Sequence, residues 1–99
     1  MLEKEVSVIV KFRPDGRSQE ALIREIGKLL SEIRQQRGCL HFDLYRSVGN
    51  RDWFLNQTWE NQQAYAQYQH SPQASQLRVL LDERSTSASE QWQLDAICA

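Results

Sequence analysis

Four short segments of the chain alternate between apolar and polar side chains, and this period of two is the strongest constraint on the fold. The segments are Glu5 to Phe12, Cys39 to Ser47, Trp53 to Trp59 and Glu90 to Ile97. Alternation with β-branched and aromatic side chains is typical of strands that bury one face. The sequence therefore predicts four β-strands, separated by turns or by helical segments.

Helical spacing separates the first two predicted strands. From Ser18 to about Arg37, apolar residues recur every three or four positions and form one stripe. Ser18 is a candidate N-cap. The positive charges of Arg34 and Arg37 interact favourably with the negative end of the helix dipole, and Gly38 suits the position after the helix. We expect one long helix here.

A second helical region follows the third predicted strand. It begins at Asn61, which can cap it, and runs to about Gln69. His70-Ser71-Pro72 then breaks the helix and restarts it, with Ser71 as N-cap and Pro72 as the first helical residue. The order β-α-β-β-α-β predicts an α+β, ferredoxin-like fold, in which helices cover one face of a four-stranded antiparallel sheet.

The two faces of this sheet differ in polarity. We expect the helices to cover the apolar row of the first strand, together with Leu40, Phe42 and Leu44. The other face then carries a mixed set of side chains and one of the two rows of the third strand. Periodicity alone does not say which of these two rows faces the helices. On this uncovered face we place Ile9, His41, Asp43, Tyr45 and Trp59. A face that is neither polar nor apolar usually marks an interface or a pocket.

Length and charge exclude several classes of protein. The 99 residues correspond to a single domain, 1–99, with its core at about 5–97. Twelve basic residues are interleaved with 13 acidic ones, so a nucleic acid is not an expected partner. No apolar run approaches the ~20 residues of a membrane span. Met1 to Glu5 lacks the apolar stretch of an export signal, and we expect a cytoplasmic protein.

The cysteines and histidines do not form a recognisable metal motif. Cys39 and Cys98 are far apart in the sequence, and the histidines are His41 and His70 alone. Structural zinc sites need closely spaced pairs of such ligands. We therefore expect no metal, and we interpret Cys39 as a small apolar core residue.

Three stretches with their spacing carry a family resemblance. They are Gly38-Cys39-Leu40-x-Phe42-x-Leu44-Tyr45-Arg46-Ser47, Trp59-Glu60-Asn61-x-x-Ala64-Tyr65 and Ser71-Pro72. Together they resemble the antibiotic biosynthesis monooxygenase family, a branch of the dimeric α+β barrels. The resemblance implies a homodimer in which two uncovered sheet faces close into a barrel. It also implies relatives that oxygenate quinol or anthrone-type compounds without a cofactor, so we expect none here.

Individual positions match this family unevenly. The resemblance makes Trp59 the cavity tryptophan and Tyr65 the aromatic side chain of the following helix. Tyr68 and Gln73 stand where relatives often carry histidines. Leu55 stands where polyketide-oxidising relatives carry an asparagine. These departures leave the catalytic roles less defined than the fold.

Oxygenation without a cofactor needs a base, because a deprotonated phenol or hydroquinone can itself reduce O₂. An imidazole exchanges protons near neutral pH, so we predict His41 as the base. Asp43, two residues on, lies on the same face and can orient it. The structural alternative is a polar pair at a strand edge or at the rim of a dimer.

A small aromatic substrate also needs a lined site. We predict that the tyrosines donate hydrogen bonds to a substrate oxygen and that the tryptophans flank its ring. The predicted substrate-binding residues are Trp59, Tyr65, Tyr68, Tyr45 and Trp53. The structural alternative is that these rings pack in the core or in an interface.

Two functions of different class therefore remain open. The first is a dimeric monooxygenase of small aromatic or quinol-type compounds, without metal or flavin. The second is a non-catalytic dimeric ligand-binding or accessory protein on the same scaffold, which the missing histidines favour. An isomerase or a dehalogenase-like lyase on this fold would need the same base.

Overall fold

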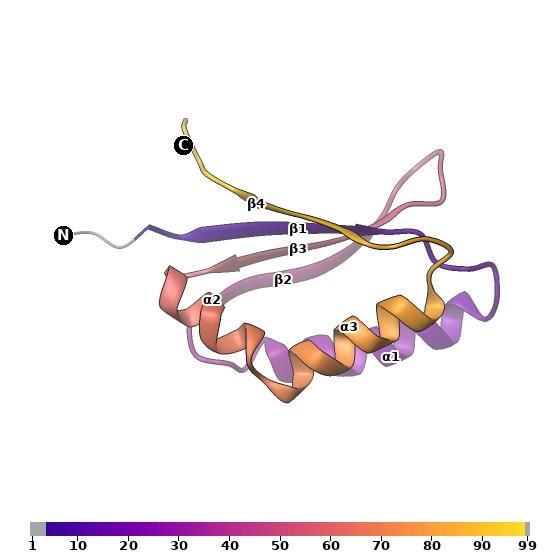
Figure 1. The fold of residues 1–99 in the computed structure, drawn as a ribbon, viewed down its shortest axis with the longest axis horizontal. Coiled ribbons are helices and arrows are strands. Elements are labelled where there is room, and N and C mark those ends of the chain that lie inside the picture. The colour runs from indigo at the N-terminus through magenta and orange to yellow at the C-terminus, as the bar shows by residue number, and fades with distance from the viewer. Residues whose placement is uncertain (1–3, 99) are drawn as a thin grey trace.

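A computed structural model of the chain describes residues 4–98, so Met1 to Glu3, on which the expectation about an export signal partly rests, lie outside the described residues. Within the described residues, four strands and three helices follow one another (Figure 1). They are β1 (Val6–Phe12), α1 (Gln19–Ile33), β2 (Cys39–Arg46), β3 (Trp53–Trp59), α2 (Gln62–Gln69), α3 (Pro72–Arg84) and β4 (Glu90–Leu94).

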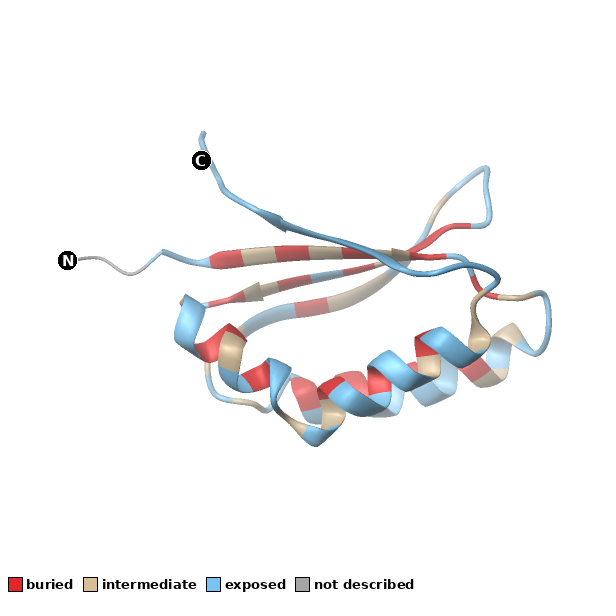
Figure 2. Cartoon of the chain, in the orientation of Figure 1, coloured by how far each residue is buried: buried red, intermediate tan, exposed pale blue. Residues whose placement is uncertain are grey.

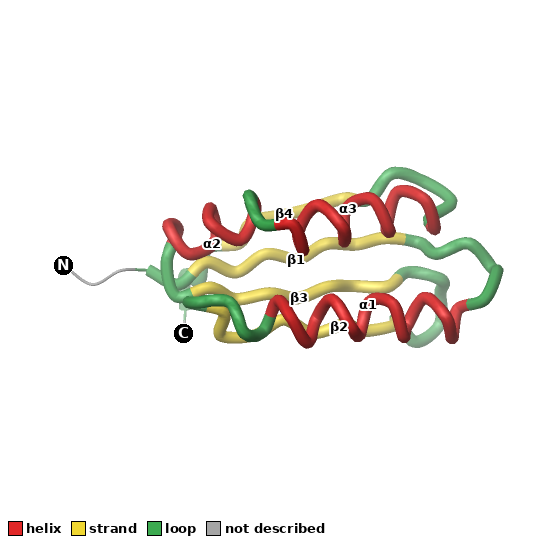
Figure 3. The backbone as a smooth tube through the Cα atoms, turned by 90° about the horizontal axis from the view of Figure 1, so that it is seen from below, coloured by secondary structure: helices red, strands yellow, loops and turns green. Residues whose placement is uncertain are grey.

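The strands form one antiparallel sheet in the order β2-β3-β1-β4. All three helices lie on the same face of this sheet, and the opposite face is open (Figure 1). Seen from the helix side, α1 lies over β2 and β3, whereas α2 and α3 lie over β1 and β4 (Figure 3). The predicted α+β, ferredoxin-like fold is confirmed.

The predicted break between the second and third helices is confirmed. The Asn61 side chain accepts a hydrogen bond from the Ala64 N–H at 2.8 Å and caps α2. The Ser71 hydroxyl accepts one from the Ala74 N–H at 3.2 Å, and Pro72 stands at the start of α3. Both caps satisfy N–H groups that have no partner within the first turn.

The ends of α1 differ from the prediction. Ser18 precedes the helix with a φ of 46°, and its side chain makes no capping hydrogen bond. Residues whose side chains cap a helix normally have an extended backbone, from which the left-handed conformation of Ser18 departs. At the other end α1 stops at Ile33 instead of about Arg37, because tight turns such as the hydrogen bond from Gln36 N–H to the Ile33 carbonyl replace the helical pattern.

The two tryptophans of β3 lie under the helices. Trp59 is opposite Val6 and Trp53 is opposite Phe12 in the register, and residues directly opposite in antiparallel strands share a face. Trp59 is 0% exposed and Trp53 is 2% exposed. The expectation that Trp59 lies on the open face is therefore wrong, because burying the large rings contributes most to the core.

The start of β2 also departs from simple alternation. The register shifts between Cys39 and His41, which is a β-bulge. Leu40 falls in the bulge and is 43% exposed, so its predicted place in the covered face is wrong. Phe42 is fully buried as expected, and Cys39 and Leu44 pack partly buried against the core.

The apolar side chains of β4 lie on the open face of the sheet, whereas the valines of β1 lie on the helix-covered face. Its five residues are all exposed, and it ends at Leu94 instead of the predicted Ile97 (Figure 2). Trp92 is opposite Ile9 and therefore lies on the open face, with Leu94 two residues on. Gln91 lies on the helix-covered face. Within residues 4–98, no helix combines the length and the apolar character that crossing a membrane requires.

Gly38 gives a direct test of the turn between α1 and β2. Its φ is +86°, and an added Cβ would lie 2.5 Å from the Cβ of Ala64. We expect Gly38→Ala to lower the free energy of unfolding by about 1–3 kcal/mol, from backbone strain and this close approach. Urea denaturation measures the change.

The matched control is Gly27→Ala in α1, where nothing lies within 4 Å of an added Cβ. We expect it to raise the free energy of unfolding by roughly 0.5–1 kcal/mol, because alanine is the better helix former. Equal effects of the two substitutions would contradict the proposed role of Gly38.

Candidate functional site

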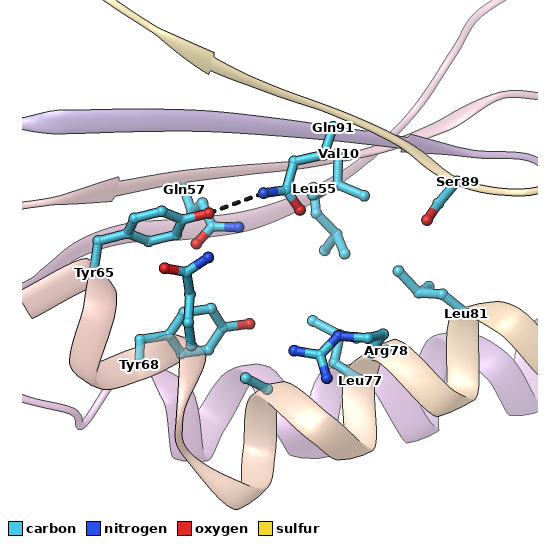
Figure 4. Close-up of a pocket in the computed structure, with 12 residues that line it drawn as sticks. Val10, Leu55, Gln57, Tyr65, Tyr68, Leu77, Arg78, Leu81, Ser89 and Gln91 are labelled. Atoms are coloured by element: carbon cyan, nitrogen blue, oxygen red, sulfur yellow. Dashed lines mark hydrogen bonds between the residues drawn. The ribbon is translucent and has the colours of Figure 1, made fainter. Parts of the chain in front are cut away.

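A small cavity lies between the helix layer and the sheet, beneath β4 (Figure 4). Its volume is about 90 Å³. Side chains from β1, β3 and β4 form one side, and those from α2 and α3 form the other. The lining consists of Val10, Leu55, Gln57, Tyr65, Tyr68, Gln69, Ala74, Leu77, Arg78, Leu81, Ser89 and Gln91.

Stacked aromatic rings fix one wall of the cavity. The ring of Tyr68 lies against Trp59 with centroids 4.8 Å apart and an interplanar angle of 23°. Tyr65 follows at 6.5 Å from Tyr68, and Phe42 meets Tyr68 edge to face at 5.5 Å. Trp59 is thus not a lining residue; it lies behind Tyr68 and holds that ring in place.

Two hydrogen bonds orient the polar groups of the cavity. The side-chain amide of Gln91 donates to the Tyr65 hydroxyl at 2.9 Å. The indole N–H of Trp59 donates to the side-chain oxygen of Gln57 at 2.8 Å. Both acceptors belong to buried residues, so each bond offsets the desolvation of a polar group.

The phenols of the cavity are neutral near pH 7. Burial raises the pKa of Tyr68, the neighbouring Tyr65 raises it further, and the Arg78 guanidinium lowers it by a smaller amount. Burial also raises the pKa of Tyr65, against a smaller lowering by the hydrogen bond from Gln91. Both hydroxyls therefore keep a proton that they can donate to a ligand.

Arg78 provides the positive charge of the cavity. It extends from α3 toward Tyr68 (Figure 4). Within residues 4–98 no carboxylate forms a salt bridge with Arg78. Phenol hydroxyls and a guanidinium together can stabilise a negatively charged oxygen.

Among residues 4–98, no carboxylate and no imidazole lines the cavity. A proton taken from a bound ligand must therefore pass to water or to a group outside the lining. Across the described part of the chain, no group of three or more His, Cys, Asp and Glu side chains is placed to hold a metal ion.

The predicted catalytic residues lie on the other face of the sheet. His41 and Asp43 are opposite Thr58 and Asn56, in the row that faces away from the helices. Asp43 forms a salt bridge at 3.0 Å with Arg34, which reaches it around the edge strand β2. The structure therefore does not bring His41 together with the tyrosines of the cavity.

The predicted binding residues are divided among three places. Tyr65 and Tyr68 line the cavity. Tyr45 lies exposed on the open face, opposite Phe54. Trp53 lies at the far end of β3 from Trp59 and packs edge to face on Phe12, with ring centroids 5.9 Å apart.

Sequence reasoning missed Gln57, Arg78 and Gln91 as lining residues. One signal was present: Gln57 shares its row of β3 with Leu55 and Trp59, so a buried row implies a buried amide. Arg78 follows the buried Leu77 on α3 and lies at the border of the apolar stripe. Nothing in the local pattern of β4 distinguishes Gln91 from a surface glutamine.

Comparisons with known proteins give a family and a fold. The sequence pattern of a family described as Antibiotic biosynthesis monooxygenase matches residues 5–79. No curated protein matches the chain.

Solved structures resemble the chain over nearly its whole length. A Mycobacterium tuberculosis protein is 23% identical with a TM-score of 0.87, covering 97% of this chain and 98% of its own. A Pseudomonas aeruginosa protein is 18% identical with a TM-score of 0.83, covering 99% of each chain. A mutant of SnoaB, a cofactor-independent oxygenase from Streptomyces nogalater, is 18% identical with a TM-score of 0.83, covering 96% of this chain and 95% of its own. At these identities the likeness shows the fold alone.

The raised pKa of Tyr68 predicts a loss of stability at alkaline pH. Above the ordinary tyrosine pKa of 10.0 the unfolded chain releases the phenol proton, while the folded chain retains it until a higher pH. The free energy of unfolding therefore falls as pH rises past about 10. We expect Tyr68→Phe to make this alkaline fall shallower, as measured by thermal unfolding across that range.

Ser75→Ala is the control, because it removes an exposed hydroxyl from α3 that is not a phenol. We expect this variant to keep the wild-type dependence on pH. An unchanged slope in Tyr68→Phe would show that burial does not hold this phenol neutral.

Proposed function

Because the chain belongs to the antibiotic biosynthesis monooxygenase family, we propose that it is a cofactor-independent monooxygenase of small aromatic or quinol-type compounds. The proposed substrate site is the cavity beneath β4. The observation that supports it is the meeting of Tyr65, Tyr68 and Arg78 on one cavity whose lining is partly apolar and partly polar. Leu55 and Tyr68, two of the positions at which the chain departs from its relatives, also line this cavity.

The chemistry depends on stabilising a substrate anion. Arg78 and the two hydroxyls favour the deprotonated form of a phenol or hydroquinone, and the proton leaves to water. The anion transfers an electron to O₂, and the two radicals combine on the ring as a peroxide. The peroxide takes a proton from water, and loss of water then leaves one oxygen atom on the ring and the other in water. The product is a quinone from a phenol and a hydroxylated quinone from a hydroquinone. All the electrons come from the substrate, so the scheme uses no cofactor.

The size of the cavity limits how a ring can bind. An apolar cavity of ~150 Å³ is known to hold benzene, whereas this one measures about 90 Å³. Gln69 lines the cavity and is exposed, so its side chain can move aside at the edge of the cavity. We propose that a ring enters with its oxygen toward Tyr65, Tyr68 and Arg78 and leaves its far edge in contact with Gln69.

A non-catalytic ligand-binding or accessory role is the second candidate. The absence of a carboxylate or an imidazole among the lining residues favours it. The same donors would then hold an aromatic anion without turnover. His41, on the open face, remains the predicted base only if a proton reaches it by a route outside the cavity.

We also propose that the protein is a homodimer that packs through the open face of its sheet. That face exposes Tyr45 by 52%, Trp92 by 45% and Leu94 by 46%. Ile9 and Phe54 lie on the same face between them. Aromatic and aliphatic side chains on one sheet face are typical of an interface, and the family resemblance supports a dimer.

Oxygen uptake with a panel of hydroquinones tests the catalytic proposal. We expect wild-type protein to consume O₂ and Arg78→Gln to lower kcat/KM roughly tenfold to hundredfold, because one charged hydrogen-bond donor to the anion is lost. Arg24→Gln, an equal change at an exposed position of α1, is the control and should keep full activity.

The outcomes separate the candidates. Thermal stabilisation by the same compounds without O₂ uptake supports the binding role and rejects the monooxygenase. Full activity of Arg78→Gln rejects the cavity as the site. Unchanged uptake by His41→Ala rejects His41 as the base.

Light scattering coupled to size-exclusion chromatography tests the dimer. We expect a dimeric wild-type protein and a monomeric Trp92→Asp variant, because the substitution buries an unpaired charge in the interface. Val79→Asp changes a residue that is 54% exposed on the helix layer and should remain dimeric. A monomeric wild-type protein would reject the proposal.

A further inference from the structure

Gln57 is a buried amide on the central strand β3, at the wall of the cavity. It is 5% exposed, and its neighbours in the same row of the strand are Leu55 and Trp59. A buried side-chain amide is costly unless its groups find partners. Only its oxygen has a partner among the described residues, the indole N–H of Trp59 at 2.8 Å.

The partner decides which way the amide points. An indole N–H can only donate, so the amide oxygen of Gln57 must face Trp59. The NH₂ group of Gln57 is then directed away from Trp59. Gln57 lines the cavity, whereas Trp59 does not. Figure 4 shows this amide between Tyr65 and Leu55 at the cavity wall. Trp59 therefore holds a hydrogen-bond donor toward the ligand position.

Three further side chains of the lining, Tyr65, Tyr68 and Arg78, can donate hydrogen bonds at the cavity. The Tyr65 hydroxyl accepts a hydrogen bond from Gln91 and keeps its own proton to donate to a ligand. The Tyr68 hydroxyl, which has no hydrogen-bond partner within residues 4–98, can likewise donate. Arg78 has donors only. The lining also holds acceptor oxygens on Gln69, Gln91 and Ser89. An anionic oxygen on a ligand would instead meet the donors of Gln57, Tyr68 and Arg78.

We propose that Gln57, oriented by Trp59, is a specificity-determining residue that donates a hydrogen bond to an anionic oxygen on an aromatic ring. This inference rests on the proposed substrate site and specifies its ligand class as phenolates, enolates and ring carboxylates. Trp59 acts as a positioning residue, since it reaches the ligand only through Gln57 and Tyr68.

The test compares 4-nitrophenolate with aniline at mildly alkaline pH, by equilibrium dialysis. Gln57→Glu keeps the oxygen that accepts from Trp59 and replaces the donor with a negative charge. We expect affinity for 4-nitrophenolate to fall about tenfold or more, while affinity for aniline stays or rises. Trp59→Phe frees the amide to rotate, and we expect a smaller loss of the preference for the anion.

Gln93→Glu is the matched control. Gln93 and Gln57 are both opposite Val8, one on each neighbouring strand, but Gln93 is exposed and does not line the cavity. The same charge change there should leave both affinities at the wild-type value. If Gln57→Glu does not fold, Gln57→Met removes the donor without adding charge, and the same loss of preference is expected.

A folded Gln57 variant with the wild-type ratio of the two affinities overturns the proposal, as does a wild-type protein that binds aniline as tightly as 4-nitrophenolate. These results are distinct from a failure of the proposed function. Anion-selective binding without O₂ uptake rejects the monooxygenase and supports the role of Gln57. Uptake that no Gln57 variant changes rejects the role of Gln57 and leaves the monooxygenase in place.

Discussion

The antiparallel register of β1 against β3 is the constraint on which the rest of the structure depends. It sets Val6 opposite Trp59 and Phe12 opposite Trp53, so the row of β3 that includes Gln57 faces the helices. A shift of one residue would turn this row to the open face and put Phe54 and its neighbours inside. The core, the cavity wall and the composition of the open face all follow from this one alignment.

Trp59 connects the core to the cavity. Its ring stacks on Tyr68, and its indole N–H holds the amide of Gln57, so one buried side chain fixes two groups of the lining. This is the usual way a fold positions a site: groups that touch a ligand are held by packed neighbours that do not. The cavity itself remains at the side of β4, an edge strand whose residues are all exposed.

The fold could be predicted well from periodicity, but the candidate site only in part. Alternation and the caps at Asn61 and Ser71 depend on local sequence, and they matched the structure. The failures are local exceptions that tertiary packing imposes: a bulge moves Leu40 out of the covered face, and a left-handed backbone at Ser18 removes a cap. His41 and the two cavity tyrosines were expected together, yet the sheet separates them, because His41 lies on the open face of β2 and the tyrosines belong to α2 on the covered face.

By itself, the sequence determined the order of strands and helices, the caps at Asn61 and Ser71, and a sheet with one half-apolar face. These features arise from the conformational preferences of neighbouring residues and from the spacing of apolar side chains. Tertiary structure alone decided that Trp59 is buried, that Gln57 and Arg78 meet Tyr68, and that the glutamines of β4 lie on the helix side of the sheet. Such contacts join residues far apart in the chain, and their energy depends on register and packing, which no local pattern specifies.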